Sequence, residues 1–144
     1  MAYQSDNIFA KILAGELPAH KVYEDEHSFA FMDLMPQAPG HTLVIPKYPA
    51  ENLFDVPANA LAHTITTTQR IATAVKAAFK AQGIMIAQLN GAAAGQTVFH
   101  LHFHIIPRSD GADFGIHARD MAPATELAEH AQRIIAALQQ LDDA

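Results

Sequence analysis

The chain has 144 residues, half of them hydrophobic, no cysteine, and a formal net charge of −6. This length suits a single domain, residues 1–144, whose core is large enough to be stable without cross-links or metals. The lack of cysteine excludes disulfides, thiolate metal sites and cysteine nucleophiles. Few basic residues argue against nucleic-acid binding, and without an apolar span or a leader-like N-terminus the sequence predicts a cytoplasmic protein that does not bind membranes.

The first half of the chain predicts a short helix followed by three strands. Asp6 is placed to cap the helix and Gly15 to end it. The apolar stripe of this helix consists of Ile8, Phe9, Ile12 and Leu13. Strands are expected over residues 21–24, 28–32 and 41–45, with a Pro/Gly-rich loop over residues 33–40.

The second half predicts two longer helices and two further strands. Residues 57–82 have apolar side chains at helical spacing, with Gly83 as the stop, and residues 84–89 predict a strand. A loop of small residues over 90–96, a strand over 98–108, a loop over 111–122 and a helix over 123–141 complete the chain. Strands and helices do not alternate regularly, so the predicted class is α+β with antiparallel pairing.

The most informative stretch is Val98 to Arg108, where three histidines occupy alternate positions between large apolar residues. In a strand, His100, His102 and His104 would share one face. The opposite face would carry Phe99, Leu101, Phe103 and Ile105. An ordinary solvated strand face is the alternative, but such a face would more often mix several polar residue types than repeat imidazole.

One chemistry available to aligned histidines is metal binding. Along a strand, neighbouring histidines of this kind lie about 7 Å apart and the outer two about 13 Å apart, measured between Cα atoms. All three therefore cannot reach one ion at about 2.1 Å from each nitrogen. A metal would need two of them together with a ligand from elsewhere, for which His41 is the candidate.

The other chemistry is nucleophilic catalysis on a phosphate ester or phosphoramidate. An imidazole attacks phosphorus, forms a covalent phospho-histidine and yields it to water, while neighbouring groups stabilise the anionic oxygens. Two imidazolium charges about 7 Å apart repel by about 2.4 kcal/mol at an effective dielectric constant of 20. This repulsion favours a neutral, nucleophilic ring near pH 7.

Two blocks of the sequence resemble the histidine-triad (HIT) family. Residues 96–106 resemble its signature of three alternating histidines, and residues 33–47 resemble its second characteristic block. The similarity covers about residues 6–108, and residues 109–144 form a C-terminal loop and helix extension. It implies an α+β HIT-like fold with a five-stranded antiparallel sheet, a short N-terminal helix, a long central helix and a C-terminal helix. The pattern is most similar to the Hint-like branch of purine nucleoside phosphoramidases.

The resemblance implies a catalytic role for each of the histidines and for Thr97. His102 would be the nucleophile that becomes adenylylated, and His104 would contact the phosphate and assist the leaving group. His100 and His41 would orient the site, and Thr97 stands where many members carry serine.

The resemblance also implies a set of substrate contacts and no cofactor or bound metal. Asp33 would hydrogen-bond the ribose hydroxyls, and Asn90 would lie near phosphate and sugar, although an aspartate before a proline loop also commonly forms a turn. The phosphate would contact Gly95, Gln96 and Thr97. The base would lie among Ile8, Phe9, Ile12 and Phe31, and Leu34 would line the pocket beside Asp33, with Phe103 as a further substrate contact, although apolar residues of this kind also form ordinary cores.

This sequence departs from the family pattern in two places. Many bacterial relatives carry Cys-x-x-Cys in the first helix as part of a structural zinc site, whereas the corresponding positions here are Asn7 and Ala10, which predicts no such zinc. The extension from Ser109 onward differs from the short Hint-type ending, which leaves the leaving group open. The histidines outside the pattern are expected to be surface or packing residues: His20, His27, His63, His117 and His130.

The predicted activity is hydrolysis of purine nucleoside 5′-phosphoramidates or adenylyl conjugates to AMP, and the resemblance implies a homodimer. Two alternatives remain at this point. One is a diadenosine polyphosphate hydrolase with the same nucleophile. The other is a non-catalytic nucleotide-binding or metal-binding module built from His41 and the triad.

Overall fold

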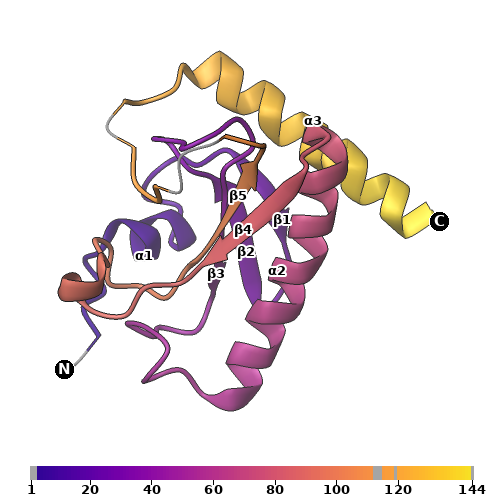
Figure 1. Cartoon of the computed structure of the whole chain (residues 1–144). Coiled ribbons are helices and arrows are strands. Elements are labelled where there is room, and N and C mark those ends of the chain that lie inside the picture. The colour runs from indigo at the N-terminus through magenta and orange to yellow at the C-terminus, as the bar shows by residue number, and fades with distance from the viewer. Residues whose placement is uncertain (1–2, 112–114, 119, 144) are drawn as a thin grey trace.

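The computed structural model describes residues 3–111, 115–118 and 120–143, which form an antiparallel sheet with helices on both faces (Figure 1). The five strands lie in the order β1-β2-β3-β5-β4, so β1 and β4 form the two edges. Their bounds are β1 Lys21–Glu24, β2 Ser28–Met32, β3 Thr42–Pro46, β4 Gly83–Ala87 and β5 Phe103–Arg108. The predicted α+β class and antiparallel sheet are therefore confirmed.

The two long helices cover one face of the sheet. Helix α2 spans Ala58–Phe79 and helix α3 spans Ala124–Asp143. Both contribute to the larger hydrophobic core, in which Ile71 and Ile134 are fully buried against Val44 of the central strand β3. No helix within the described ranges is long and apolar enough to cross a membrane.

The short helix α1, Ile8–Leu13, covers the opposite face (Figure 1). Its Phe9 packs with Phe29, Phe31, Leu43 and Ile45, which alternate along β2 and β3 with the residues facing the larger core. In the register of the sheet, Leu43 lies opposite His104, so His104 shares the α1 face. The candidate histidines thus lie between the sheet and the N-terminal helix.

Two predicted helix ends differ from the structure. The N-cap of α1 is Asn7, not Asp6, because the side chain of Asn7 accepts the backbone N–H of Ala10 at 2.9 Å. Helix α2 ends three residues before the predicted Gly83, at Lys80, which adopts a left-handed conformation with φ 49°. The backbone N–H of Ala81 then bonds the carbonyl of Lys76, which completes the helix terminus.

The strand predicted over residues 98–108 begins only at Phe103. Residues 98–102 lie outside the sheet ladder because their polar groups bond the end of β3 and the loop that follows it instead. The backbone N–H of Leu101 bonds the carbonyl of Ala50, and Nε2 of His100 bonds the carbonyl of Pro46 at 2.8 Å. The loop predicted over 111–122 is only partly described, because residues 112–114 and 119 lie outside the described ranges.

Gly40, directly before His41, provides a test of this packing. Its φ is +94°, and a Cβ atom there would lie 2.8 Å from Cδ2 of Phe79. We expect Gly40→Ala to lower the free energy of unfolding by about 2 to 5 kcal/mol, because backbone strain and overpacking add. Urea denaturation measures the change. Gly83→Ala is the control, since its Cβ would meet no atom within 4 Å. Equal effects of the two substitutions would contradict the packing of Gly40 against Phe79.

Candidate active site

The central triad histidine, His102, presents an unprotonated nitrogen. Its Nδ1–H donates to the carbonyl of His100 at 2.7 Å, so the neutral ring carries its lone pair on Nε2. The side chain is buried, and its ring meets Phe9 edge to face with centroids 4.9 Å apart. Burial lowers the pKa of His102 to about 4. The ring is therefore neutral at pH 7, and Nε2 is the atom suited to attack.

The neutral state was expected from repulsion between imidazoles, but burial is its main cause. Desolvation is the largest influence lowering the pKa of His102 and His104, and the charges of neighbouring histidines contribute less. The pKa of His104 falls to about 3, as does that of His41. Loss of hydration disfavours the charged form of a buried base whatever its neighbours are.

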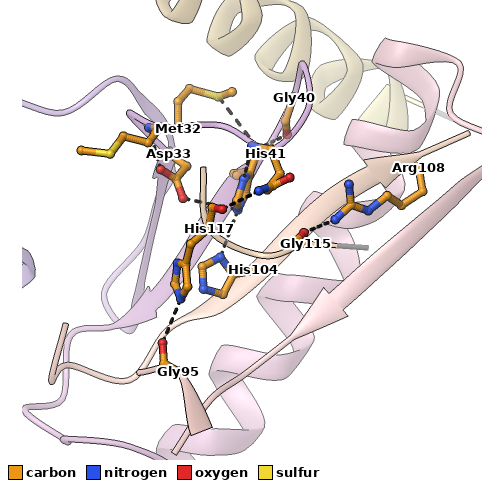
Figure 2. A network of polar contacts seen from close by, with 12 residues as sticks. Met32, Asp33, Gly40, His41, Gly95, His104, Arg108, Gly115 and His117 are labelled. Atoms are coloured by element: carbon orange, nitrogen blue, oxygen red, sulfur yellow. Dashed lines mark hydrogen bonds and ion pairs between the residues drawn. The ribbon is translucent and has the colours of Figure 1, made fainter. Parts of the chain in front are cut away.

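A chain of hydrogen bonds sets the tautomers of His41 and His104 (Figure 2). The backbone N–H of Gln37 donates to Nδ1 of His41 at 3.0 Å, so the proton of His41 is on Nε2. This Nε2–H donates to Nδ1 of His104 at 3.0 Å. His104 therefore carries its own proton on Nε2, which is buried without a partner in the described structure. That N–H is available to an oxygen of a bound ligand.

Asp33 lies beside this chain of hydrogen bonds. Its Oδ2 is 3.4 Å from Nε2 of His41, and its Oδ1 accepts the backbone N–H of Met35 at 2.8 Å. Burial raises the pKa of Asp33 to about 6, against the smaller lowering effects of the Met35 hydrogen bond and the charge of His117. The carboxylate is thus ionised at pH 7 and accepts hydrogen bonds at the rim of the site.

Within the described residues, Asp33, His41 and His104 are the group whose ligand atoms lie close enough to hold a metal ion, all within 4.8 Å. Their tautomers do not fit this role. Nε2 of His41 carries a proton while Nδ1 accepts the N–H of Gln37. Metal binding would move that proton to Nδ1, where it would face the same N–H. The cluster fits a hydrogen-bond chain better than a metal centre.

His100 is held from both sides and does not face the cavity. Its Nε2–H donates to the carbonyl of Pro46, and its Nδ1 accepts the hydroxyl of Tyr3 at 2.6 Å. The same hydroxyl accepts Nδ2 of Asn7 at 3.0 Å, and burial lowers the pKa of His100. Asn7, where many relatives carry a zinc-binding cysteine, thus belongs to a hydrogen-bonded network with Tyr3 and His100. Its effect is to fix the His100 carbonyl that orients His102.

The small-residue loop is fixed by Gln96. The side-chain Oε1 of Gln96 accepts the N–H of Gly91 at 2.8 Å, and its Nε2 donates to the carbonyls of Glu51 and Val98. Gly95 has a φ of +102°, a conformation that favours glycine. Gln96 therefore holds the shape of the loop, with its side chain directed into the loop itself.

The cavity of the site lies between α1, β2 and the triad. Its volume is about 270 Å³. Nine of the predicted residues line it: Ile8, Phe9, Ile12, Phe31, Asp33, Leu34, Thr97, His102 and His104. Additional lining residues that the sequence did not single out are Pro18, Ala19, Met32, Met35, Leu43, Val98, His117 and Ala118.

The remaining predicted residues do not line this cavity. His41, His100 and Gln96 lie behind it, in the roles just described. Asn90 binds Gln88 and the backbone N–H of Leu53. Phe103 is wrongly placed among the substrate contacts: it packs with Ala50 and Leu101, and opposite Val44 in the register it faces away from His104. The alternation along β5 already assigned Phe103 to that face.

His117 is the functional candidate that the sequence analysis missed. Nothing in its spacing relates it to the triad, because it reaches the site through a loop of the C-terminal extension. Its Nε2–H donates to the carbonyl of Gly95 at 2.8 Å, and its ring centroid lies 5.7 Å from that of His104 (Figure 2). His117 is therefore an exposed residue that nevertheless lines the cavity.

The buried histidines predict that stability falls in mild acid. In the folded chain the pKa values of His41, His102 and His104 are about 3, 4 and 3, below the ordinary 6.5, so the unfolded chain binds more protons as the pH falls below 6.5. Asp33 acts in the opposite direction below pH 6, but it is one group against three. We expect the urea midpoint to fall steadily from pH 7 to pH 5.

The control for this prediction is His102→Gln, which removes one of the three titrating groups. The variant should show a shallower decrease of the midpoint over the same pH range. A wild-type midpoint that stays constant between pH 7 and pH 5 would mean that the buried rings bind protons as readily as exposed ones.

Known proteins resemble this chain in sequence. Residues 14–111 match the sequence profile of the HIT domain. Protein hit of Bacillus subtilis is 44% identical over 121 residues, which cover 81% of this chain and 83% of that protein. Adenosine 5′-monophosphoramidase HNT1 of Saccharomyces cerevisiae is 41% identical over 103 residues, 72% of this chain and 63% of that protein. Adenylylsulfatase HINT3 of Arabidopsis thaliana is 38% identical over 107 residues, 74% and 54% of the two chains.

Solved structures show the same fold. A Hit-like protein of Bartonella henselae, described as involved in cell-cycle regulation, superposes with a TM-score of 0.90 at 52% identity over 95% of this chain and 99% of that one. A zinc-bound histidine triad family protein of Mycobacterium smegmatis gives a TM-score of 0.84 at 37% identity over 96% of both chains. With sequence and fold in agreement, the chain belongs to the HIT domain family.

Proposed function

We propose that this chain hydrolyses purine nucleoside 5′-phosphoramidates, or closely related adenylyl conjugates, to AMP through a nucleotidyl-His102 intermediate. The observation that carries the proposal is the state of His102: a neutral ring whose Nδ1–H is fixed by the carbonyl of His100 and whose Nε2 lone pair lines the cavity. An imidazole held in this way can form a bond to phosphorus without first losing a proton.

The surrounding groups suit each part of such a substrate. The apolar side chains of Phe9 and Phe31 would hold the flat purine, and the ionised Asp33 would accept hydrogen bonds from the ribose hydroxyls. The unpartnered Nε2–H of His104 and the hydroxyl of Thr97 would bind phosphate oxygens. These donors would stabilise the negative charge that develops as His102 attacks.

The names of two relatives support the nucleotide half of this proposal. HNT1 is named an adenosine 5′-monophosphoramidase and HINT3 an adenylylsulfatase. Both names describe AMP joined to a different leaving group, and the apolar lining of the cavity with Asp33 at its rim would suit the AMP half. We choose a phosphoramidate because its nitrogen leaving group requires protonation, and His117, an exposed imidazole, also lines the cavity.

Mass spectrometry of the intermediate tests the proposal. The protein is mixed with an adenosine 5′-phosphoramidate, quenched within milliseconds under alkaline conditions that preserve phospho-histidine, and digested. We expect the peptide that contains His102 to gain the mass of an adenylyl group. An adduct on another residue, or turnover with no adduct at any quench time, would overturn the proposal.

We further propose that the chain forms a homodimer through β4 and α2. β4 is an edge strand, and beside it Ile86 and Ile65 are 43% and 44% exposed although both are large and apolar. They line one groove together with Ile84 and Ala72. A second copy placed across a two-fold axis would cover this groove and pair the open strand edge.

Light scattering after size exclusion tests the dimer. We expect the wild-type chain to have twice the 15.6 kDa chain mass, and Ile86→Asp to shift the protein to the monomer mass. Phe54→Asp is the control, since Phe54 is 83% exposed and lies outside the groove. A monomeric wild type, or a dimer that survives Ile86→Asp, would overturn this interface.

A further inference from the structure

His117 is held beside the triad by hydrogen bonds of its ring, of its own carbonyl and of the carbonyl of Gly115. The carbonyl of His117 accepts Nε2 of Gln37 at 2.6 Å, and the carbonyl of the nearby Gly115 accepts the guanidinium of Arg108 (Figure 2). The ring itself is oriented by its bond to Gly95. Main-chain and side-chain contacts thus place an imidazole from the C-terminal extension beside the triad, where it contacts the loop that precedes the triad.

The buried imidazoles cannot readily supply a proton to a leaving group. His41 and His104 are neutral and joined by a hydrogen bond, and His102 is neutral because burial lowers its pKa to about 4. A neutral imidazole N–H is a very weak acid. Asp33 is ionised at pH 7 and accepts the N–H of Met35. His117 is the other titratable side chain that lines the cavity, and it is exposed to solvent.

Among the described residues, four titratable groups interact with His117. His104 meets its ring edge to face, and the charge of His117 acts on Asp33, His41 and His102 as well as on His104. It lowers the pKa of each of these four groups. A proton on His117 therefore helps to keep the nucleophile neutral and the carboxylate ionised.

We propose that His117 is a further catalytic residue, the general acid that protonates the leaving nitrogen of a phosphoramidate. The inference rests on the proposed function. With Nε2–H held by Gly95, Nδ1 is the atom that carries the transferred proton. As Nε2 of His102 forms its bond to phosphorus, the phosphorus–nitrogen bond breaks, its electron pair stays on the leaving nitrogen, and Nδ1–H of His117 supplies the proton.

The second half of the cycle restores the starting state. Water attacks the phosphorus of nucleotidyl-His102, the bond from phosphorus to Nε2 breaks, and its electron pair returns to the ring. The proton released by water goes to Nδ1 of the now neutral His117. In sum, the phosphoramidate and one water give a nucleoside monophosphate and an amine, so protons and electrons balance.

The variant His117→Gln separates proton donation from positioning. A glutamine amide can still donate to the carbonyl of Gly95, but it cannot transfer a proton. Single-turnover adenylylation is measured with an alkylamine phosphoramidate of AMP and with the 4-nitrophenyl ester of AMP, whose leaving group departs without a proton. We expect the rate with the alkylamine to fall about 100-fold or more, and the rate with the nitrophenyl ester to change less than about threefold.

The pH profile and a matched variant complete the test. The wild-type rate with the alkylamine should decrease at high pH, and His117→Gln should lose that dependence. His63→Gln, an exposed histidine outside the cavity, should match the wild type with both substrates. Equal losses with both substrates, or no loss with either, would overturn the role of His117. Failure of the wild type to adenylylate His102 with the nitrophenyl ester would instead contradict the proposed function.

Discussion

Replacing His102 by alanine is expected to lower turnover of an adenosine phosphoramidate by about 10⁴-fold or more and to leave AMP binding within a few fold. The substitution removes the nitrogen proposed to form the covalent bond to phosphorus, so the proposed two-step route would be lost. Binding should persist because the apolar residues of the cavity and Asp33 remain in place. Steady-state kinetics and calorimetric titration with AMP measure the two quantities.

The control for this prediction is His63→Ala, which removes an exposed imidazole outside the cavity and should leave both quantities unchanged. Far-ultraviolet circular dichroism checks that each variant is folded. Turnover of His102→Ala within tenfold of the wild type would remove this residue from the role of nucleophile, and a parallel loss of AMP binding would indicate a damaged cavity.

Replacing Ile134 by alanine is expected to lower the free energy of unfolding by about 2 to 5 kcal/mol. Ile134 is fully buried where α3 meets Ile71 and Val75 of α2, and truncation leaves a cavity that rigid neighbours fill only in part. Urea denaturation measures the loss. Gln132→Ala on the exposed side of the same helix should change the stability by less than about 0.5 kcal/mol.

The outcome at Ile134 also tests how α3 is attached. Arg70 of α2 pairs with Asp142 near the end of α3, but both side chains are partly exposed, and exposed ion pairs contribute little. If Arg70→Ala destabilised the chain more than Ile134→Ala, polar contacts rather than the core would hold the helix in place.

The alternation of residue types predicted much of the fold. β1 and β2 were predicted with their observed ends, because the turn between them is closed locally by Asp25, whose Oδ1 accepts the N–H groups of His27 and Ser28. The ends of α1 and α2 were less accurate. Asn7 and Asp6 are both good capping residues, and only the geometry of the chain decides between them.

Site residues that lie close together in sequence could be predicted, whereas those that distant segments bring to the site could not. The alternating triad identified His102 and His104, and the family resemblance supplied Asp33 and the apolar residues that line the cavity. The start of β5 depends on bonds to the loop after β3, which no local pattern encodes. His117 was missed for the same reason, since its partners Gly95 and Gln37 are far away in sequence.

Main-chain atoms determine which ring nitrogen carries the proton in His41 and in His102. The N–H of Gln37 fixes His41, and the carbonyl of His100 fixes His102. Because every residue other than proline supplies the same N–H and every residue supplies a carbonyl, substitutions at neighbouring side chains leave these two constraints intact. The walls of the cavity can therefore change, in natural variants or by design, to admit a different ligand while Nε2 of His102 keeps its lone pair.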